Sequence, residues 1–283
     1  MTVSEIFESV KDSLFKGSIS EPENEARLLL EIYCDINRSD LVLNKDKEIS
    51  EDKLEALRGA LNQRITHRPL WYITGKAPFM GLDFSVDERV LIPRADTEIL
   101  VEEALRDLRD GSRILDMCTG SGCILISLLK YSNDCSGVGV DISEGALEVS
   151  KQNAADILGK EVDIKFVQSD LFENVDGTYE VIVSNPPYIA SKEVDGLMPE
   201  VKDYEPRMAL DGEESGLVFY EKIIPEAKKR LAKGGSIYFE IGYDQGEAVR
   251  ELLEKEGFIE VRIIKDYAGL DRVACAVKSV LDD

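Results

Sequence analysis

Three apolar stretches with helical spacing dominate the first 75 residues of the chain. Residues 6–14 repeat an apolar side chain every fourth position, and residues 26–33 form a second such stretch. Residues 50–65 carry a third apolar face and begin with Ser50, a residue type that caps helix N-termini. This pattern predicts a small helical domain over residues 1–75.

The pattern changes between residues 68 and 93, where glycine, proline and aromatic residues are frequent. Apolar positions between 79 and 86, followed by the run Val90–Ile92, predict two short strands that pair as a hairpin. We therefore expect residues 76–93 to form a β-hairpin linker.

From residue 94 onward, predicted strands and helices alternate. The strands are residues 113–117, 137–141, 163–168, 179–184 and 236–241, and the helices are residues 98–109, 123–131, 144–157, 216–232 and 245–256. Two last strands, residues 258–264 and 272–277, have no helix between them. This order predicts an α/β domain over residues 94–283, with a doubly wound, Rossmann-like sheet and an antiparallel strand near its end.

The chain is strongly acidic, with 56 Asp and Glu against 34 Lys and Arg and a net charge of −22. Residues 1–75 hold 14 acidic and 10 basic side chains, so the remainder carries −18. Because such a surface repels phosphates, we expect no direct nucleic-acid binding, and a basic protein partner is favoured.

Cysteine and histidine usage narrows the possible chemistry. The five cysteines include no Cys-x-x-Cys pair and there is a single histidine, so we expect neither a disulfide framework nor a metal site. The N-terminus lacks the features of a signal peptide, and no apolar run approaches the ~20 residues of a membrane span. We expect a cytoplasmic monomer without membrane contact.

Three predicted strands end in residues suited to a nucleoside. The first leads into a turn with Gly120 and Gly122, which let the backbone approach a ligand closely. The second ends in Asp141, whose carboxylate can accept hydrogen bonds from both ribose hydroxyls. The third is followed by Asp170 and by Leu171, which can line an adenine pocket.

The glycine turn differs from that of dinucleotide-binding enzymes. Its spacing is not Gly-x-Gly-x-x-Gly, since residue 118 is cysteine and residue 125 is leucine. Asp116, just before the turn, would also repel a pyrophosphate. A cationic nucleoside without phosphates, such as S-adenosylmethionine, suits an acid-lined pocket better, so we favour a methyltransferase over a dehydrogenase.

The fourth predicted strand is followed by Asn185-Pro186-Pro187-Tyr188. The prolines fix φ and lack N–H donors, so this turn has bare carbonyls and an amide side chain, all able to accept hydrogen bonds from a planar –NH2 group. If Asn185 Oδ1 and the Pro186 carbonyl accept its two hydrogens, charge developing on the nitrogen is stabilised and its lone pair is oriented. Tyr188 would stack on the planar group. We expect catalytic roles for Asn185, Pro186 and Tyr188, and substrate contacts throughout residues 185–188.

From about residue 68 to its C-terminus, the chain resembles the HemK-type (PrmC) release-factor glutamine methyltransferases. The shared motifs are Arg68-Pro69-Leu70, Phe84-Ser85-Val86, Val90 to Arg94 with Thr97-Glu98, Asp116 to Gly122, Ser169 to Phe172, Asn185 to Tyr188, Tyr204-Glu205-Pro206 with Ala209-Leu210, and Glu240-Ile241-Gly242. Asn-Pro-Pro-Tyr alone is shared with adenine-N6 methyltransferases, whereas its combination with the segments around Pro93 and Pro206 is specific.

The resemblance implies the donor, the acceptor and the cofactor contacts. The donor is S-adenosylmethionine, and the acceptor is the glutamine of the Gly-Gly-Gln loop in peptide chain release factors one and two, which the helical domain helps to grip. By position, the cofactor-binding residues are Cys118, Thr119, Gly120, Ser121, Gly122, Asp141, Asp170, Leu171 and Asn185. At position 118 the family commonly has glycine. We expect that residue 118 needs no positive φ, because Gly120 and Gly122 remain.

Three alternatives stay open on the residues alone. A glutamine methyltransferase acting on a ribosomal protein shares the same chemistry. An adenine amino methyltransferase acting on nucleic acid is disfavoured by the −18 charge of residues 76–283. A non-enzymatic module that keeps a nucleoside pocket is disfavoured by the intact sequence of residues 185–188.

Overall fold

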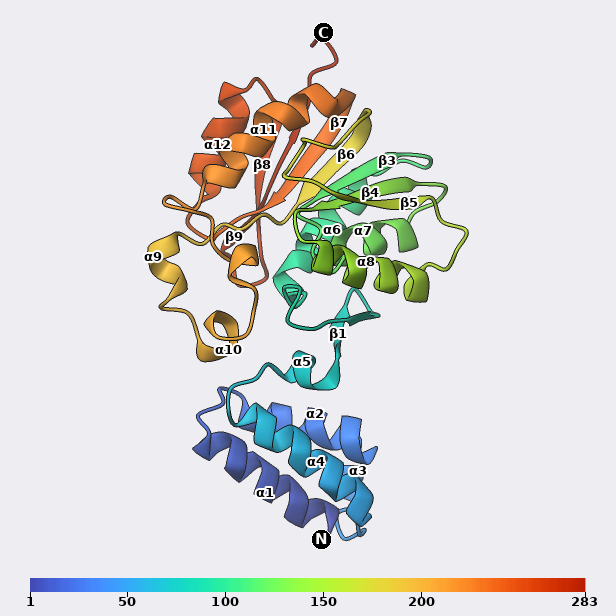
Figure 1. Cartoon of the computed structure of the whole chain (residues 1–283), viewed down its shortest axis with the longest axis vertical. Coiled ribbons are helices and arrows are strands. Elements are labelled where there is room, and N and C mark those ends of the chain that lie inside the picture. The colour runs from blue at the N-terminus through green and yellow to red at the C-terminus, as the bar shows by residue number, and fades with distance from the viewer. Residues whose placement is uncertain (283) are drawn as a thin grey trace. The chain divides into compact units, whose positions relative to one another are not determined.

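A computed structural model describes residues 1–282, and residue 283, the last position of the predicted second domain, lies outside them. The described chain divides into two compact units. The helical unit contains Met1–Gly75 together with Met198–Tyr204, and the sheet unit contains the rest of the chain (Figure 1).

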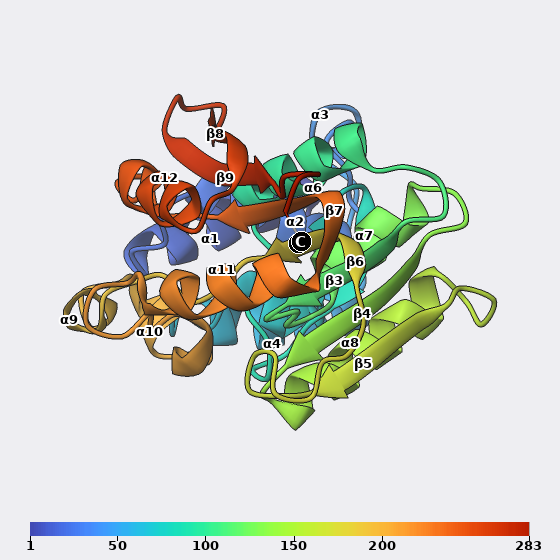
Figure 2. The same ribbon diagram turned by 90° about the horizontal axis from the view of Figure 1, so that it is seen from above.

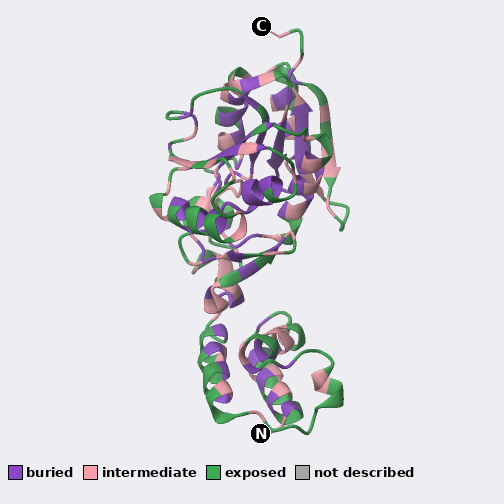
Figure 3. Cartoon of the chain, turned by 90° about the vertical axis from the view of Figure 1, so that its right-hand side faces the viewer, coloured by how far each residue is buried: buried purple, intermediate pink, exposed green. Residues whose placement is uncertain are grey.

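The helical unit is built on three amphipathic helices and two short ones. Its helices are α1 (Val3–Lys16), α2 (Pro22–Cys34), α3 (Asp40–Leu43), α4 (Glu51–Arg64) and α5 (Leu70–Thr74). Each long helix buries one apolar face and exposes the other (Figure 3), and the buried faces form one core. Ser50 occupies the N-cap position of α4, but its side chain makes no capping hydrogen bond, unlike Thr2, which caps α1 through a capping box with Glu5.

A segment distant in sequence also belongs to the helical unit. It contains α10 (Pro199–Lys202) and is held by a buried charge cluster. Arg64 Nε lies 2.6 Å from a Glu25 carboxylate oxygen, and Arg64 Nη2 lies 3.3 Å from Glu200 Oε1. Arg64 is almost fully buried, and the two carboxylates offset part of the cost of removing its charge from water.

The sheet unit begins with a β-hairpin of β1 (Lys76–Phe79) and β2 (Leu82–Ser85), which pair antiparallel. Met80 and Gly81 both have positive φ, +50° and +70°, as a two-residue hairpin turn requires. The presence of a hairpin is confirmed, but both of its strands lie within residues 76–85, and the strand predicted at Val90–Ile92 is wrong. Those residues are irregular, and the run ends before Pro93, which has no N–H to donate to a ladder.

A seven-stranded sheet forms the centre of this unit, as predicted. Its strands are β3 (Arg113–Met117), β4 (Ser136–Asp141), β5 (Ile164–Gln168), β6 (Tyr179–Ser184), β7 (Leu231–Glu240), β8 (Ile259–Lys265) and β9 (Asp271–Val277). Their order is β5-β4-β3-β6-β7-β9-β8. All neighbours are parallel except that β9 runs antiparallel to both β7 and β8, which confirms the expected antiparallel strand.

Helices cover both faces of this sheet (Figure 2). One face packs against α6 (Ala95–Asp107), α7 (Cys123–Lys130) and α8 (Glu144–Ile157), and the other packs against α11 (Val218–Arg230) and α12 (Gly246–Lys255). The short elements α9 (Ser191–Val194) and η1 (Arg207–Ala209) lie in the long connection after β6. In residues 1–282, no helix combines the length and apolar character needed to cross a membrane.

Candidate active site

A cavity of about 400 Å³ opens at the carboxyl ends of the neighbouring parallel strands β3, β4, β5 and β6. Ligands of open α/β sheets bind at this edge. The predicted site residues that line it are Cys118, Thr119, Gly120, Ser121, Asp141, Asp170, Leu171, Asn185 and Pro187. Gly122, Pro186 and Tyr188 do not line this cavity.

The turn after β3 uses left-handed backbone at three alternate positions. Cys118, Gly120 and Gly122 have φ values of +62°, +55° and +80°. The expectation that residue 118 needs no positive φ is therefore wrong. The left-handed residue redirects the chain so that the Thr119 N–H donates to the Val140 carbonyl at 2.9 Å. An L-residue in this conformation costs about 1–2 kcal/mol, a cost that glycine avoids.

Gly120 and Gly122 serve different purposes in this turn. A Cβ at Gly120 would meet no atom within 4 Å, so the backbone borders open space at the cavity. A Cβ at Gly122 would lie 2.8 Å from Ile126 Cδ1 and 3.1 Å from the Ser150 Cβ, so this position is closed by packing between α7 and α8. Gly120 can face a ligand, whereas Gly122 permits close helix packing.

Asp141 is held by backbone amides on both sides. Its Oδ2 accepts the Gly120 N–H at 2.9 Å, and its Oδ1 accepts the Ser143 N–H at 2.9 Å. Burial raises the pKa of this carboxyl, and the two amides oppose the rise. The two amides therefore fix the orientation of a carboxylate that lines the cavity between the first two strands.

Asp116 lies behind this wall and is fully buried. Thr119 donates its hydroxyl to Asp116 Oδ2 at 2.6 Å, but within residues 1–282 no partner satisfies Oδ1. Burial raises the pKa of Asp116 to about 7, and the Thr119 hydroxyl opposes the rise. The turn is thus backed by a carboxyl whose charge is poorly compensated.

The turn after β6 is fastened by side chains. Ser184 donates its hydroxyl to the Met117 carbonyl at 2.7 Å, which ties the end of β6 to the end of β3. Asn185 and Pro187 face the cavity. The Tyr188 hydroxyl instead donates to Glu240 Oε1 at 3.1 Å, and burial raises the pKa of this tyrosine. Tyr188 is therefore anchored to the end of β7 at its hydroxyl.

Models of known protein families match both parts of the chain. The PrmC N-terminal domain matches residues 5–75, and the methyltransferase small domain matches residues 95–200. A release factor glutamine methyltransferase of Clostridium acetobutylicum is 42% identical over 284 residues, covering 96% of this chain and 99% of that protein. A release factor glutamine methyltransferase of Geobacter sulfurreducens is 38% identical, covering 96% of this chain and 95% of that protein. This chain belongs to the release factor glutamine methyltransferase family.

Family membership confirms the resemblance drawn from the motifs. Among solved structures, a methyltransferase from Pyrococcus furiosus superposes with a TM-score of 0.53 over 81% of this chain and 100% of that one. At 19% identity this match shows the shared fold alone.

The cavity also contains residues that the motifs did not assign to the cofactor. They are chiefly apolar or basic, and include Arg89, Val90, Arg94, Thr97, Ile142, Met208, Phe219 and Lys222. Some were within reach of sequence reasoning, because Ile142 follows Asp141 directly and is half exposed. Others come from segments brought together only by the fold, which no local pattern reveals.

An ion pair fixes the segment after Tyr204 beside the cavity. Arg94 Nη2 lies 2.5 Å from Glu205 Oε1. The Glu205 side chain is 1% exposed, and burial raises its pKa while Arg94 opposes the rise. Pro206 and Met208, which follow, line the cavity. The motif around Pro206 therefore borders the site.

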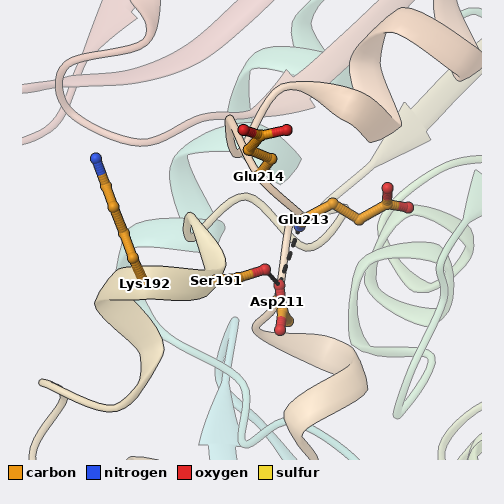
Figure 4. A pocket seen from close by; sticks show the side chains of 5 residues that line it. All are labelled: Ser191, Lys192, Asp211, Glu213 and Glu214. Atoms are coloured by element: carbon orange, nitrogen blue, oxygen red, sulfur yellow. Dashed lines mark hydrogen bonds between the residues drawn. The ribbon is translucent and has the colours of Figure 1, made fainter.

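A second, open hollow adjoins the first (Figure 4). Its floor is Asp211, whose Oδ1 accepts the Ser191 hydroxyl at 2.5 Å and the Glu213 N–H at 3.0 Å. Lys192 points away from these acids in Figure 4. Glu213 lines both hollows. Asp211 therefore holds the loop together, and we assign this hollow a structural role beside the larger cavity.

Proposed function

We propose that this chain transfers a methyl group from S-adenosylmethionine to the side-chain amide nitrogen of the Gly-Gly-Gln glutamine in peptide chain release factors one and two. Family membership supports this assignment. The observation that carries it is the placement of Asn185, at the mouth of an acceptor-only turn, on the wall of the same cavity as Asp141 and Gly120.

The cavity suits a cationic nucleoside. Asp141 and Asp170 supply negative charge, and the open space at Gly120 allows a ligand to approach the backbone. Leu171 and Ile142 add apolar surface on which a base can rest. S-adenosylmethionine, when bound, supplies an electrophilic methyl carbon. We assign its ribose to Asp141, where the orientation of the carboxylate is fixed by two amides.

The turn after β6 suits a carboxamide. Pro186 and Pro187 have no N–H, so no backbone donor at these positions competes for the acceptors. Asn185 Oδ1 and the Pro186 carbonyl would accept the two amide hydrogens of the substrate glutamine. Those contacts stabilise charge that develops on the nitrogen and hold its lone pair in one direction. The proton then released can pass to water, so no histidine base is required.

A direct comparison of substrate classes tests the proposal. Purified release factor, ribosomal proteins and bulk nucleic acid would each be incubated with the chain and S-adenosylmethionine labelled in its methyl group. We expect label in the release factor, and mass spectrometry should locate it on the Gly-Gly-Gln glutamine. Label in a ribosomal protein or in nucleic acid, with none in the release factor, would overturn the proposal in favour of that substrate.

A further inference from the structure

A chain of hydrogen bonds runs from the end of β7 to the carboxamide of Asn185. Thr97, in the first turn of α6, donates its hydroxyl to Glu240 Oε2 at 2.5 Å. Asn185 Nδ2 donates to Thr97 Oγ1 at 3.4 Å, which is long for a hydrogen bond. Thr97 and Glu240 are both buried, at 2% exposure each. Three segments far apart in sequence thus meet at the cavity, which Thr97 and Asn185 both line.

The direction of this chain is set by Glu240. Both of its oxygens accept, Oε2 from Thr97 and Oε1 from the Tyr188 hydroxyl at 3.1 Å. Burial raises the pKa of the Glu240 carboxyl, and the Thr97 and Tyr188 hydroxyls and the charge of Arg272 oppose the rise. In its ionised form the carboxylate can only accept, so each hydroxyl donates its single hydrogen to it. The Thr97 oxygen then has lone pairs left and no hydrogen, and it can only accept from Asn185.

This polarity decides which end of the Asn185 amide faces the cavity. With Nδ2 turned toward Thr97, Oδ1 is turned away and is available to a ligand. The flipped amide would place Oδ1 against the Thr97 oxygen, so that two acceptors would meet without a hydrogen between them. Such a contact leaves both oxygens without a donor and is disfavoured.

We propose that Thr97 and Glu240 are positioning residues, which orient the Asn185 carboxamide so that its Oδ1 accepts a hydrogen from the substrate –NH2 group. This inference rests on the proposed function, because it assigns a role within amide methylation. It gives the buried glutamate a task beyond packing, since the carboxylate sets the direction of both hydroxyls next to the transfer site.

The competing explanation is that the Thr97 hydroxyl only attaches α6 to β7. Thr97→Val keeps the shape of the side chain and removes its hydroxyl, whereas Thr97→Ser keeps the hydroxyl. A purely structural attachment predicts a loss of stability without a selective loss of turnover. Thr178→Val, at an exposed position outside the site, is the matched control for the chemical change.

Single-turnover methyl transfer to release factor, with both reactants saturating, separates the two explanations. We expect Thr97→Val to slow transfer ~10-fold or more, because a misoriented catalytic amide loses its alignment with the substrate. Thr97→Ser should recover the rate to within about threefold, and cofactor affinity should be unchanged in both. Equal rates for Thr97→Val and wild type, or equal losses in the Val and Ser variants, would overturn the proposal.

Glu240→Leu provides a second arm. Leucine has neither accepting oxygen, so the Thr97 hydroxyl becomes free to donate to Asn185 Oδ1 and the amide can turn over. We expect transfer to slow as it does in Thr97→Val, with cofactor affinity again unchanged. An unaltered rate in a folded Glu240→Leu variant would contradict the claim that the carboxylate sets the direction of the hydrogen bonds.

A readout that needs no substrate keeps this inference separate from the proposed function. The side-chain amide signal of Asn185 can be assigned in a ¹⁵N NMR spectrum by its loss in Asn185→Ala. We expect this signal to move and to exchange faster with solvent in Thr97→Val, but not in Thr97→Ser or Thr178→Val. An unmoved signal in Thr97→Val would overturn the inference. Absence of methyl transfer by the wild type would overturn only the proposed function.

Discussion

The turns after β3 and β6 lie at the ends of adjacent parallel strands, yet they are built in opposite ways. The turn after β3 contains glycines and left-handed residues, and it presents backbone N–H groups, such as that of Gly120, next to carboxylates. The turn after β6 contains two prolines without N–H groups, and its side chains are fastened by other side chains, as Tyr188 is by Glu240.

This contrast indicates a division of labour within one cavity. The first turn combines acids with open backbone, which suits a cationic nucleoside with ribose hydroxyls. The second turn offers only acceptors, which suits a planar –NH2 group. If each turn has its own role, a substitution in the turn after β6 should leave cofactor affinity intact, and one in the turn after β3 should leave the rate of transfer intact. The following changes test that separation.

The largest effect is expected from Asn185→Ala, which removes the side-chain acceptor of the second turn. Turnover should fall ~100-fold or more, as for the loss of a preorganised group that stabilises developing charge. Cofactor affinity, measured by calorimetry, should stay within a few-fold of wild type. Turnover equal to that of wild type would break the proposed role of the second turn.

Asp141→Ala should produce the converse result. Removing a charged acceptor of ribose hydroxyls should weaken cofactor binding by about 1.5–3 kcal/mol, or roughly 10- to 160-fold. With cofactor saturating, the rate of transfer should remain near that of wild type. Asp163→Ala, at an exposed position, controls for the loss of one negative charge. Unchanged cofactor affinity in Asp141→Ala would remove this residue from the site.

The Asp116 carboxyl should have a smaller effect, which is a contribution to folding stability that depends on pH. Its pKa is about 7 in the folded chain against an ordinary value of 3.8, so the folded state binds the proton more tightly. The resulting stability is complete below about pH 4 and is lost as pH rises through about 7. Between pH 6 and pH 8 this carboxyl should lower the free energy of unfolding by about 1 kcal/mol.

Urea unfolding of wild type and Asp116→Asn at the two pH values isolates this contribution, because other titrations cancel in the difference. We expect Asp116→Asn to gain stability relative to wild type on going from pH 6 to pH 8. A difference that does not change with pH would show that the Asp116 carboxyl has no raised pKa.

Cys118→Gly should have the smallest effect. Glycine removes the strain of the left-handed backbone at φ +62°, which should stabilise the folded state by about 1–2 kcal/mol. It also raises the entropy of the unfolded chain, which should destabilise the folded state by about 0.4–1 kcal/mol. The net expectation is a gain of about 0.5 kcal/mol in unfolding free energy, without loss of cofactor affinity. A loss of stability would show that the cysteine side chain contributes packing that outweighs the strain.

Local patterns predicted the elements of the sheet well and their long-range contacts poorly. β3 and β6 each contain a short apolar run, Ile114-Leu115 and Val181-Ile182-Val183, and the bounds of both strands were predictable from the sequence to the residue. The predicted strand at Val90–Ile92 failed because an apolar run can be buried without pairing. The prediction for the φ angle of Cys118 failed because φ at one position depends on the path that the neighbouring strand imposes.

Contacts between distant segments were beyond sequence reasoning altogether. Thr97 and Glu240 occur in recognisable motifs, yet nothing in either motif indicates that the two side chains meet behind Asn185. In the same way, the residues that follow Leu197 give no local sign that Glu200 pairs with Arg64 of the helical unit. Such pairs become visible only when the fold brings the elements together.

The most direct test of the division between the two turns replaces the substrate group itself. Transfer of labelled methyl from S-adenosylmethionine would be measured to release factor with its Gly-Gly-Gln glutamine intact, and to release factor with that glutamine replaced by glutamate. Glutamate has the same shape but no N–H to offer an acceptor-only turn. We predict label on the glutamine protein alone. Comparable label on the glutamate protein would contradict the account, because the second turn would then not select an –NH2 group.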